Sequence, residues 1–297
     1  MSTVPVEIID THAHLDDAAF DPDRPEVLQR AADMGIRRIV NVGYNPDRWA
    51  TTRALTETHP GIRGMYGLHP QEAARFSAQT LDALEATLRS SRPVAVGEIG
   101  LDYFRGRSDE TLQRQSFVAQ IDLARRLALP IVIHQRAAES ELVEILTRSA
   151  SLPPVLLHSF DGSQVLADLA ISRGWLLGVG GLATKPGRDD LRQVLATVPL
   201  ANIVLETDAP YLVPAGIRNR RNEPANLATA IHQLADIWGV GAESMAAATT
   251  NTAEQFFAIG PVVAAAAAGP ERTVRDEPNR MVGGVDPKSG AHGLHGP

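Results

Sequence analysis

The sequence contains no cysteine, no long apolar run and no excess of basic residues. Without cysteine the chain forms no disulfide bonds and offers no thiolate, so any bound metal must be held by nitrogen and oxygen atoms. No stretch of about 18 apolar residues is present, as a membrane-spanning helix would require, and the N-terminus lacks the basic-then-apolar pattern of a secretion signal. We therefore expect a soluble, cytoplasmic protein without a membrane partner.

The balance of charge is acidic. With 28 Lys and Arg against 35 Asp and Glu, the formal net charge is -7 at pH 7. This charge argues against a broad basic surface that binds nucleic acids without sequence preference, although a locally basic cleft stays open. A nucleic acid substrate would have to be held by a few arginines and by bound metal ions.

Short apolar segments alternate with helical patterns along most of the chain. Eight such segments lie at 6–10, 36–42, 62–66, 93–98, 130–134, 154–158, 174–179 and 202–208. Most of them lack strict alternation, as is typical of strands covered on both faces. Repeated strand-then-helix units give an open doubly wound sheet or a closed (β/α)8 barrel, and the count of eight favours the barrel.

The chain is predicted to form one α/β domain, a TIM (β/α)8 barrel, over residues 1–260. Its 297 residues could make two domains, but barrels of this size are common. Helices at about 223–238 and 242–258 are expected to close the domain. Residues 261–297 hold an alanine run and then Gly, Pro and charged residues, with almost no large apolar side chain. We expect this tail to be disordered.

Histidine and acidic residues end several of the predicted strands. His12 and His14 end the first, and because side chains alternate along a strand, both project to the same side. Glu98 ends the fourth strand, where a buried carboxylate requires a cation: either bound metal ions or an arginine such as Arg105. His134 and His158 end the fifth and sixth strands in the same manner.

The eighth predicted strand carries two acids on one face, Glu206 and Asp208. Asp208 is nearer the C-terminal end of the strand, so we expect it to be a metal ligand and a proton acceptor. Glu206 lies deeper. It is predicted to orient a histidine, or else to be a paired structural acid.

Together the strand ends offer six nitrogen and oxygen ligands. In a barrel the C-terminal ends of all strands open onto one mouth, so these side chains are expected to meet. Six ligands suit two divalent ions about 3.5–4 Å apart, with Glu98 as the bridge, and such a pair lowers the pKa of a bound water to about 7. This set predicts hydrolysis and leaves Mg, Mn, Zn, Ni or Fe open as the metal. The predicted ligands are His12, His14, Glu98, His134, His158 and Asp208.

Several stretches resemble the TatD-type metal-dependent hydrolases, in order, from residue 6 to about 258. They are Asp10-Thr11-His12-Ala13-His14-Leu15-Asp16, Gly67-Leu68-His69-Pro70, Gly97-Glu98-Ile99-Gly100-Leu101-Asp102-Tyr103, Val132-Ile133-His134, Leu157-His158-Ser159-Phe160 and Glu206-Thr207-Asp208-Ala209-Pro210-Tyr211-Leu212. The resemblance implies a barrel of the amidohydrolase superfamily whose members are typically magnesium-dependent deoxyribonucleases, often 3′ to 5′ exonucleases. It implies the same six ligands, and it adds His69 as an active-site histidine. From its spacing alone, His69 is a residue of the mouth that could shuttle a proton, contact phosphate or merely cap a turn.

The chain departs from the family pattern at two places. Position 13 is Ala where Cys is frequent, which we expect to be harmless because that side chain faces away from the two histidines. After His134 the family usually has Ser-Arg and an acid, whereas this chain has Gln135-Arg136-Ala137. Contact of Arg136 with phosphate is retained, while any role of the missing acid is lost.

Basic and aromatic side chains after the later strands are candidates for substrate binding. The basic candidates are Arg136, Lys185, Arg218, Arg220 and Arg221, each of which could instead be a solvated surface charge. Tyr103, Phe104 and Tyr211 could stack on a base, with core packing as the alternative for Phe104. Of these, Arg136, Tyr103 and Tyr211 are the predicted substrate-binding residues.

The leading prediction is a monomeric, two-metal deoxyribonuclease that acts on single-stranded DNA or 3′ ends. A metal-activated water attacks the phosphodiester, Asp208 accepts its proton, and Glu98 and His69 complete the catalytic set. A cyclic amidase or lactonase on the same barrel is the rival enzyme, although a carboxylated Lys often bridges the metals there and this chain offers Glu98. A non-catalytic scaffold is a third reading, against which the intact ligand set argues.

Overall fold

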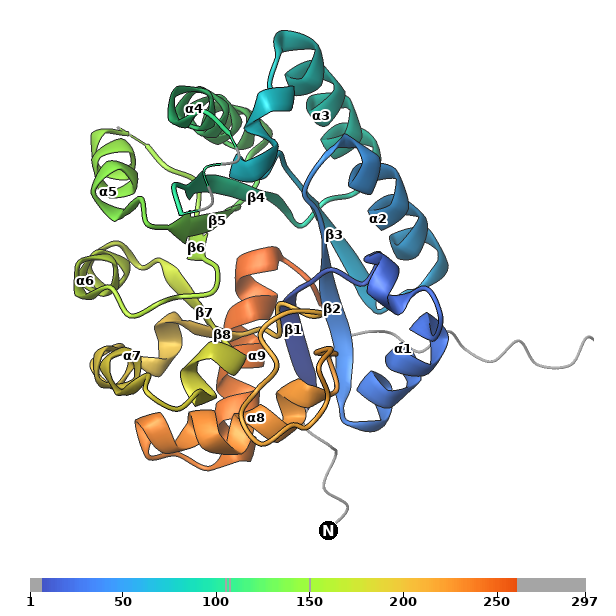
Figure 1. The fold of residues 1–297 in the computed structure, drawn as a ribbon, viewed down its shortest axis with the longest axis vertical. Helices are drawn as coiled ribbons and strands as arrows, with labels where there is room; N and C mark the ends of the chain where they lie inside the picture. The colour runs from blue at the N-terminus through green and yellow to red at the C-terminus, as the bar shows by residue number, and fades with distance from the viewer. Residues whose placement is uncertain (1–6, 105, 107, 150, 261–297) are drawn as a thin grey trace, which may run out of the picture. The chain divides into compact units, whose positions relative to one another are not determined.

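The computed structural model describes residues 7–104, 106, 108–149 and 151–260. Eight strands form one sheet in which every strand lies beside its neighbours in the sequence, and all seven ladders are parallel. Figure 1 shows the strands around a common centre, with most of the helices outside them. The strands are β1 (Ile8–Ala13), β2 (Ile36–Gly43), β3 (Ile62–Tyr66), β4 (Ala95–Asp102), β5 (Ile131–Arg136), β6 (Val155–Leu157), β7 (Leu176–Val179) and β8 (Ile203–Leu205).

The sheet closes between β1 and the residues that follow β8. Ala13 forms a parallel bridge with Ala209, and the amide of His14 donates to the carbonyl of Ala209 at 2.7 Å. The amide of Asp208 donates to the carbonyl of His12 at 2.8 Å. These contacts confirm the predicted barrel and exclude the open doubly wound sheet.

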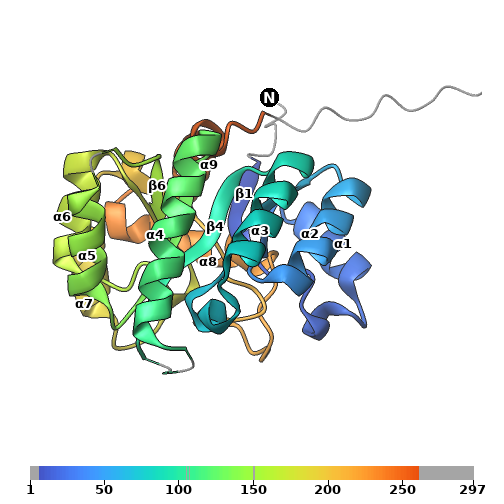
Figure 2. The ribbon, with the colours of Figure 1, turned by 90° about the horizontal axis from the view of Figure 1, so that it is seen from above.

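The helices pack on the outside of the sheet, as Figure 2 shows from a second direction. Some of their N-termini are capped by a side chain: that of Ser163 accepts from the amide of Leu166, and that of Asp109 accepts from the amide of Leu112. The helices are α1 (Arg24–Asp33), α2 (Pro46–Thr58), α3 (Ala78–Ser90), α4 (Glu110–Leu127), α5 (Glu139–Arg148), α6 (Gln164–Arg173), α7 (Asp189–Leu195), α8 (Asn226–Ala235) and α9 (Ala242–Phe257). Short 3-10 helices lie at Ala18–Phe20, Pro70–Arg75, Gly181–Thr184, Leu200–Asn202 and Asp236–Trp238. None of the described helices is both long enough and apolar enough to cross a membrane.

The hydrophobic core has two parts. The larger cluster includes residues of the strands and of the surrounding helices, such as Ile99 of β4 and Phe117 of α4. A smaller cluster contains strand residues such as Val40, Met65 and Val132, and Phe257 of α9 belongs to it. Strands in contact with both clusters are buried on both faces, which explains their near-continuous apolar sequences.

Some element boundaries differ from the sequence prediction. β1 continues to Ala13 and β4 to Asp102, because Ala13 still pairs with Asn41 of β2 and Asp102 with Arg136 of β5. β8 stops at Leu205, three residues before Asp208, whose φ of 54° turns the chain out of the strand. The predicted tail, 261–297, and Arg105, the alternative partner of Glu98, lie outside the described residues, so the boundary at 260 stays a prediction.

Candidate metal centre

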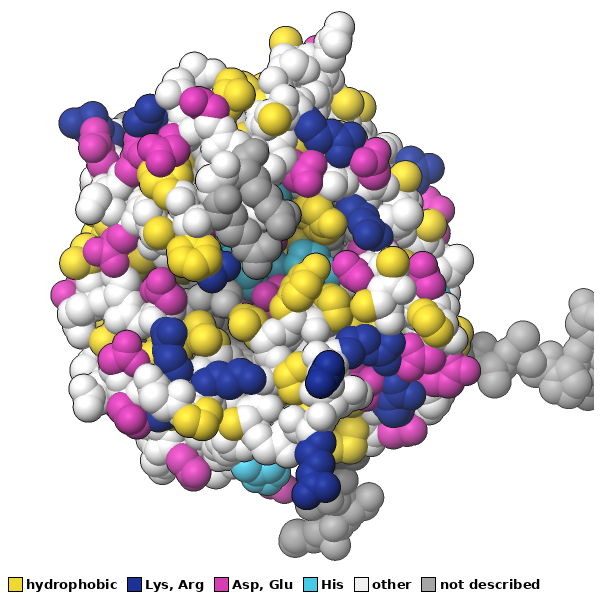
Figure 3. All heavy atoms as spheres, in the orientation of Figure 1, with side chains coloured by type: hydrophobic (Ala, Val, Ile, Leu, Met, Phe, Trp, Pro, Cys, Tyr) yellow, Lys and Arg dark blue, Asp and Glu magenta, His cyan; other side chains and the backbone are white. Residues whose placement is uncertain are grey.

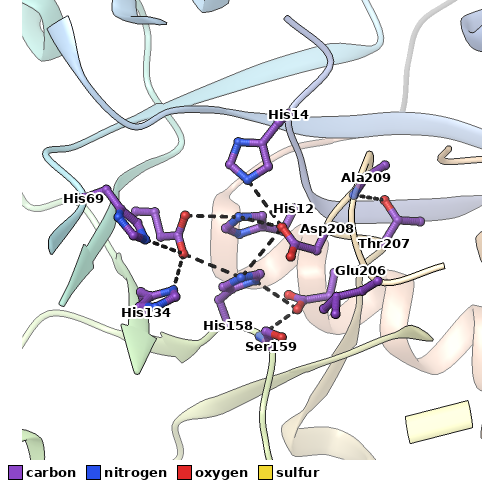
Figure 4. A network of polar contacts seen from close by, with 12 residues as sticks. His12, His14, His69, His134, His158, Ser159, Glu206, Thr207, Asp208 and Ala209 are labelled. Carbon is purple, nitrogen blue, oxygen red and sulfur yellow. Dashed lines mark hydrogen bonds and ion pairs between the residues drawn. The ribbon is translucent and has the colours of Figure 1, made fainter. Parts of the chain in front are cut away.

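Imidazole and carboxylate side chains gather at the C-terminal ends of the strands. In the orientation of Figure 1, Figure 3 shows histidine at the bottom of a hollow on this face, with hydrophobic and basic side chains around it. Figure 4 shows the labelled histidines and Asp208 directed toward one another. All six predicted ligands meet here, as does His69: His12 and His14 from β1 and the residue after it, Glu98 from β4, His134 from β5, His158 after β6 and Asp208 after β8.

Glu98 is the centre of this cluster. Its Oε1 lies 2.8 Å from Nδ1 of His134 and 3.6 Å from Nε2 of both His69 and His158. Its Oε2 lies 3.5 Å from Nε2 of His12. The two oxygens of one carboxylate therefore face different histidines, which is the placement that a bridging ligand requires.

Asp208 approaches the cluster from the side of β1. Its Oδ1 lies 3.3 Å from Nε2 of His14, 3.8 Å from Nε2 of His12 and 3.9 Å from Nε2 of His158. Its backbone has a left-handed φ of 54°, a conformation that aspartate tolerates better than most residues. The hydrogen bond from its amide to the carbonyl of His12 fixes this turn, so the carboxylate is held beside His12 and His14.

The ligand atoms fall into groups small enough to hold a metal ion. His12, His14 and Asp208 form one group, His69, Glu98 and His134 form another, and His12, His158 and Glu206 form a third. In each group the ligand atoms lie within 4.8 Å of one another. Both ring nitrogens of the fully buried His12 lack a hydrogen-bond partner among the described residues. Unpaired nitrogen at such a position is costly unless a ligand satisfies it, so the donor set fits divalent cations.

The ionisation of the cluster supports the same conclusion. Burial opposes ionisation of Glu98, but the surrounding His69, His158 and His12 hold its pKa well below the ordinary value. Burial also opposes ionisation of Asp208, whose pKa is nevertheless lowered by His14 and His158. Both acids are therefore carboxylates at neutral pH, and they supply the negative charge that divalent cations require.

Two histidines have pKa values set mainly by burial. Desolvation lowers the pKa of His12, and it lowers the pKa of His69 to about 3. Both rings are therefore neutral at pH 7 and carry a lone pair. The Nδ1 of His69 accepts from the amide of Gln71 at 3.1 Å, which leaves Nε2 directed at Glu98.

Glu206 contacts His158, in agreement with the orienting role that the sequence suggested. Its Oε1 lies 3.0 Å from Nδ1 of His158 and accepts from the amide of Ser159 at 2.7 Å. A Cβ at Gly178 would lie 2.1 Å from Glu206 Oε2, so only glycine leaves room for this carboxylate. With Nδ1 of His158 beside Glu206, Nε2 of the same ring faces the cluster and lies 3.6 Å from Oε1 of Glu98.

Asp102 belongs to the site, and the sequence reasoning missed it. Its Oδ2 lies 3.2 Å from Nε2 of His134 and accepts from Gln71 Nε2 at 2.6 Å. The signal was available in the strand pattern, because Asp102 is four residues after Glu98 and thus on the same side of β4. With Nε2 of His134 beside Asp102, Nδ1 of the same ring points toward Glu98.

The predicted substrate-binding residues have different surroundings. Arg136 is exposed, and its guanidinium lies 4.0 Å from the centre of the Phe104 ring. The Tyr103 hydroxyl donates to Glu141, and its ring packs against the core. Tyr211 is exposed.

Of the other basic candidates, Arg221 is engaged in an ion pair with Asp23, with distances of 2.6 and 2.8 Å. Arg218 and Arg220 are exposed, and Lys185 is half-buried. Among the contacts of the described residues, none joins these three side chains to the cluster.

A closed α/β barrel with imidazoles and carboxylates gathered at the C-terminal ends of its strands defines the class of TIM-barrel metal-dependent hydrolases. The family model described as TatD related DNase matches residues 9–258, and the chain belongs to this family. It is a metal-dependent hydrolase, as the sequence predicted.

The matches to known relatives span nearly the whole length of those relatives. The chain is 34% identical to the uncharacterized metal-dependent hydrolase YabD of Bacillus subtilis over 255 residues, which are 85% of this chain and 99% of YabD. It is 32% identical to the 3′-5′ ssDNA/RNA exonuclease TatD of Erwinia tasmaniensis, covering 84% of this chain and 99% of that protein. The crystal structure of YjjV, a TatD homolog from Escherichia coli K12, matches with a TM-score of 0.81 at 33% identity, covering 86% of this chain and 99% of YjjV.

Proposed function

We propose that this protein is a two-metal exonuclease that removes nucleotides from the 3′ end of single-stranded DNA. One observation carries the proposal: Glu98 faces separate histidines with its two oxygens, in a cluster that holds three groups of candidate ligands. Two of these groups suit a pair of ions, one with His12, His14 and Asp208 and one with His69, Glu98 and His134.

In this proposal, the side chains of the cluster hold the metal ions in place, supply negative charge and provide a proton acceptor. Divalent ions bound here would offset the charge of a phosphodiester and lower the pKa of a water molecule to about 7. Asp208 is ionised, and its Oδ1 is directed toward His12 and His14, so a proton released between these groups has an acceptor at this oxygen. Glu206 and Asp102 hold His158 and His134 in fixed orientations.

The phosphate backbone requires positive charge at the mouth, and Arg136 provides it. Its side chain is exposed and lies over the Phe104 ring, and no ion pair within the described residues engages it. A guanidinium is suited to bidentate contact with phosphate oxygens. The substrate itself is inferred from relatives such as the Erwinia protein, which carries the name of a 3′-5′ ssDNA/RNA exonuclease.

The test is incubation of manganese-loaded protein with a single-stranded oligonucleotide labelled at its 5′ end, beside a lactone and a dihydropyrimidine. We expect a ladder that shortens from the 3′ end, and loss of at least about 100-fold in rate for Asp208→Asn. Ile171→Ala, on the exposed surface of α6, is the control and should act like the parent protein. Hydrolysis of the lactone or the dihydropyrimidine without nucleotide release would refute the nuclease and favour the cyclic amidase or lactonase.

A further inference from the structure

Two exposed aromatic rings lie beside the candidate metal centre. In the described part of the chain, six large hydrophobic side chains are exposed: Met34, Phe104, Val118, Val165, Ile171 and Tyr211. Only two of these are aromatic, Phe104 at 65% and Tyr211 at 53% exposure. Both follow residues of the cluster within three positions, whereas large aromatic residues elsewhere, such as Phe20 and Phe117, are fully buried.

Phe104 is attached to the side of the cluster that contains His134. Its amide donates to Oδ1 of Asp102 at 3.1 Å, and Oδ2 of the same carboxylate lies 3.2 Å from His134 Nε2. The Arg136 guanidinium lies 4.0 Å from the ring centre. One face of the ring is therefore supported by a cation, while most of the side chain stays exposed to solvent.

Tyr211 is attached to the side of the cluster that contains His14. Its amide donates to the carbonyl of Asp208 at 2.8 Å, and its ring centre lies 5.8 Å from that of His14. The two aromatic rings are therefore fixed to different ends of the ligand set, with Glu98 between His134 and His12. A phosphodiester held at the cluster would have one ring at each side.

We propose that Phe104, supported by Arg136, and Tyr211 are stacking subsites for unpaired nucleobases on either side of the phosphodiester that is cleaved. The proposal rests on the proposed function and names the chemical class that the mouth accepts, a single strand with bases free to leave their stack. Every nucleobase has a π face, so the subsites accept any sequence, and stacking on an aromatic side chain strengthens binding roughly tenfold or more per base. A base within a duplex is already stacked and paired, so the subsites favour unpaired ends.

The test uses the full chain with Asp208→Asn, loaded with manganese, so that oligonucleotides bind without turnover. Single strands carry 2-aminopurine at the 3′-terminal or the penultimate position, and the fluorescence of this base falls when it stacks. We expect quenching on binding at one or both positions. Adding Phe104→Leu or Tyr211→Leu should abolish the quenching at one position and weaken binding about tenfold, which is about 1.4 kcal/mol.

Controls separate stacking from a general effect on the fold. Phe104→Trp restores a ring and should restore quenching, while Val165→Ala removes exposed apolar surface on α6 and should change nothing. Unchanged quenching and affinity in both leucine variants would overturn the subsites, even if the parent protein digests DNA. Conversely, stacking in a protein whose parent form digests no oligonucleotide would keep the subsites and refute the exonuclease.

Discussion

Replacing Gln120 by Met tests how α4 supports the loop that carries His69. Gln120 is 1% exposed, and its side-chain amide pairs with both backbone groups of Leu68: Oε1 accepts from the amide at 2.7 Å, and Nε2 donates to the carbonyl at 3.1 Å. β3 pairs with β4 only at Met65 and Tyr66, so β4 forms no ladder hydrogen bonds with the backbone of Leu68. The glutamine amide takes the place of a neighbouring peptide group.

The expected loss of stability follows from these two contacts. Leaving a buried amide or carbonyl unpaired costs about 1–3 kcal/mol each, and methionine keeps the volume, so we expect the free energy of unfolding to fall by about 3 kcal/mol. For a domain of this size that loss lowers Tm by about 6–12 °C. Urea unfolding followed by circular dichroism measures the free energy. Gln29→Met, at an exposed position of α1, is the matched control and should stay within about 0.5 kcal/mol. A loss below about 0.5 kcal/mol for Gln120→Met would refute the reasoning.

Three further predictions concern the metal centre. Glu206→Gln should weaken manganese binding about 10–100-fold in calorimetry, because His158 loses the carboxylate that orients it, and unchanged affinity would contradict this. The affinity for manganese should also rise from about pH 6 to about pH 8. Burial lowers the pKa of His158, but Glu206 and Glu98 raise it to about 10, so protons compete with the metal for this side chain. A flat calorimetric profile over this pH range would exclude the competition. Manganese at 100 times Kd should stabilise the fold by about 2.7 kcal/mol, which raises Tm by about 5–10 °C in a thermal melt, and no shift would show that the folded state binds no metal.

The barrel was predictable because its signal is repeated. Eight apolar segments alternate with helical patterns, and each repeat independently indicates the same architecture. The closure was less visible, since the bridge between Ala13 and Ala209 joins residues 196 positions apart and lies outside β8. Strand ends were misplaced where polar residues such as Asp102 continue a ladder, because an apolar pattern cannot mark them.

The meeting of the candidate ligands was predictable for a different reason. A histidine or acid at the end of an apolar strand is conspicuous, and parallel strands of a barrel bring such ends together. The supporting contacts were not, because Asp102 with His134 and Gln120 with Leu68 depend on side-chain geometry across different elements. Tyr103 and Phe104 show the same limit, because the sequence alone does not reveal that Tyr103 contacts Glu141 while the neighbouring Phe104 is exposed.

The prediction that two cations bind at this site is tested most directly by diffraction from crystals soaked in manganese, with anomalous scattering to locate the ions. The account predicts two peaks about 3.5–4 Å apart on either side of Glu98, one beside His12, His14 and Asp208 and one beside His134. A single peak, or peaks that leave Glu98 without a metal contact, would contradict it.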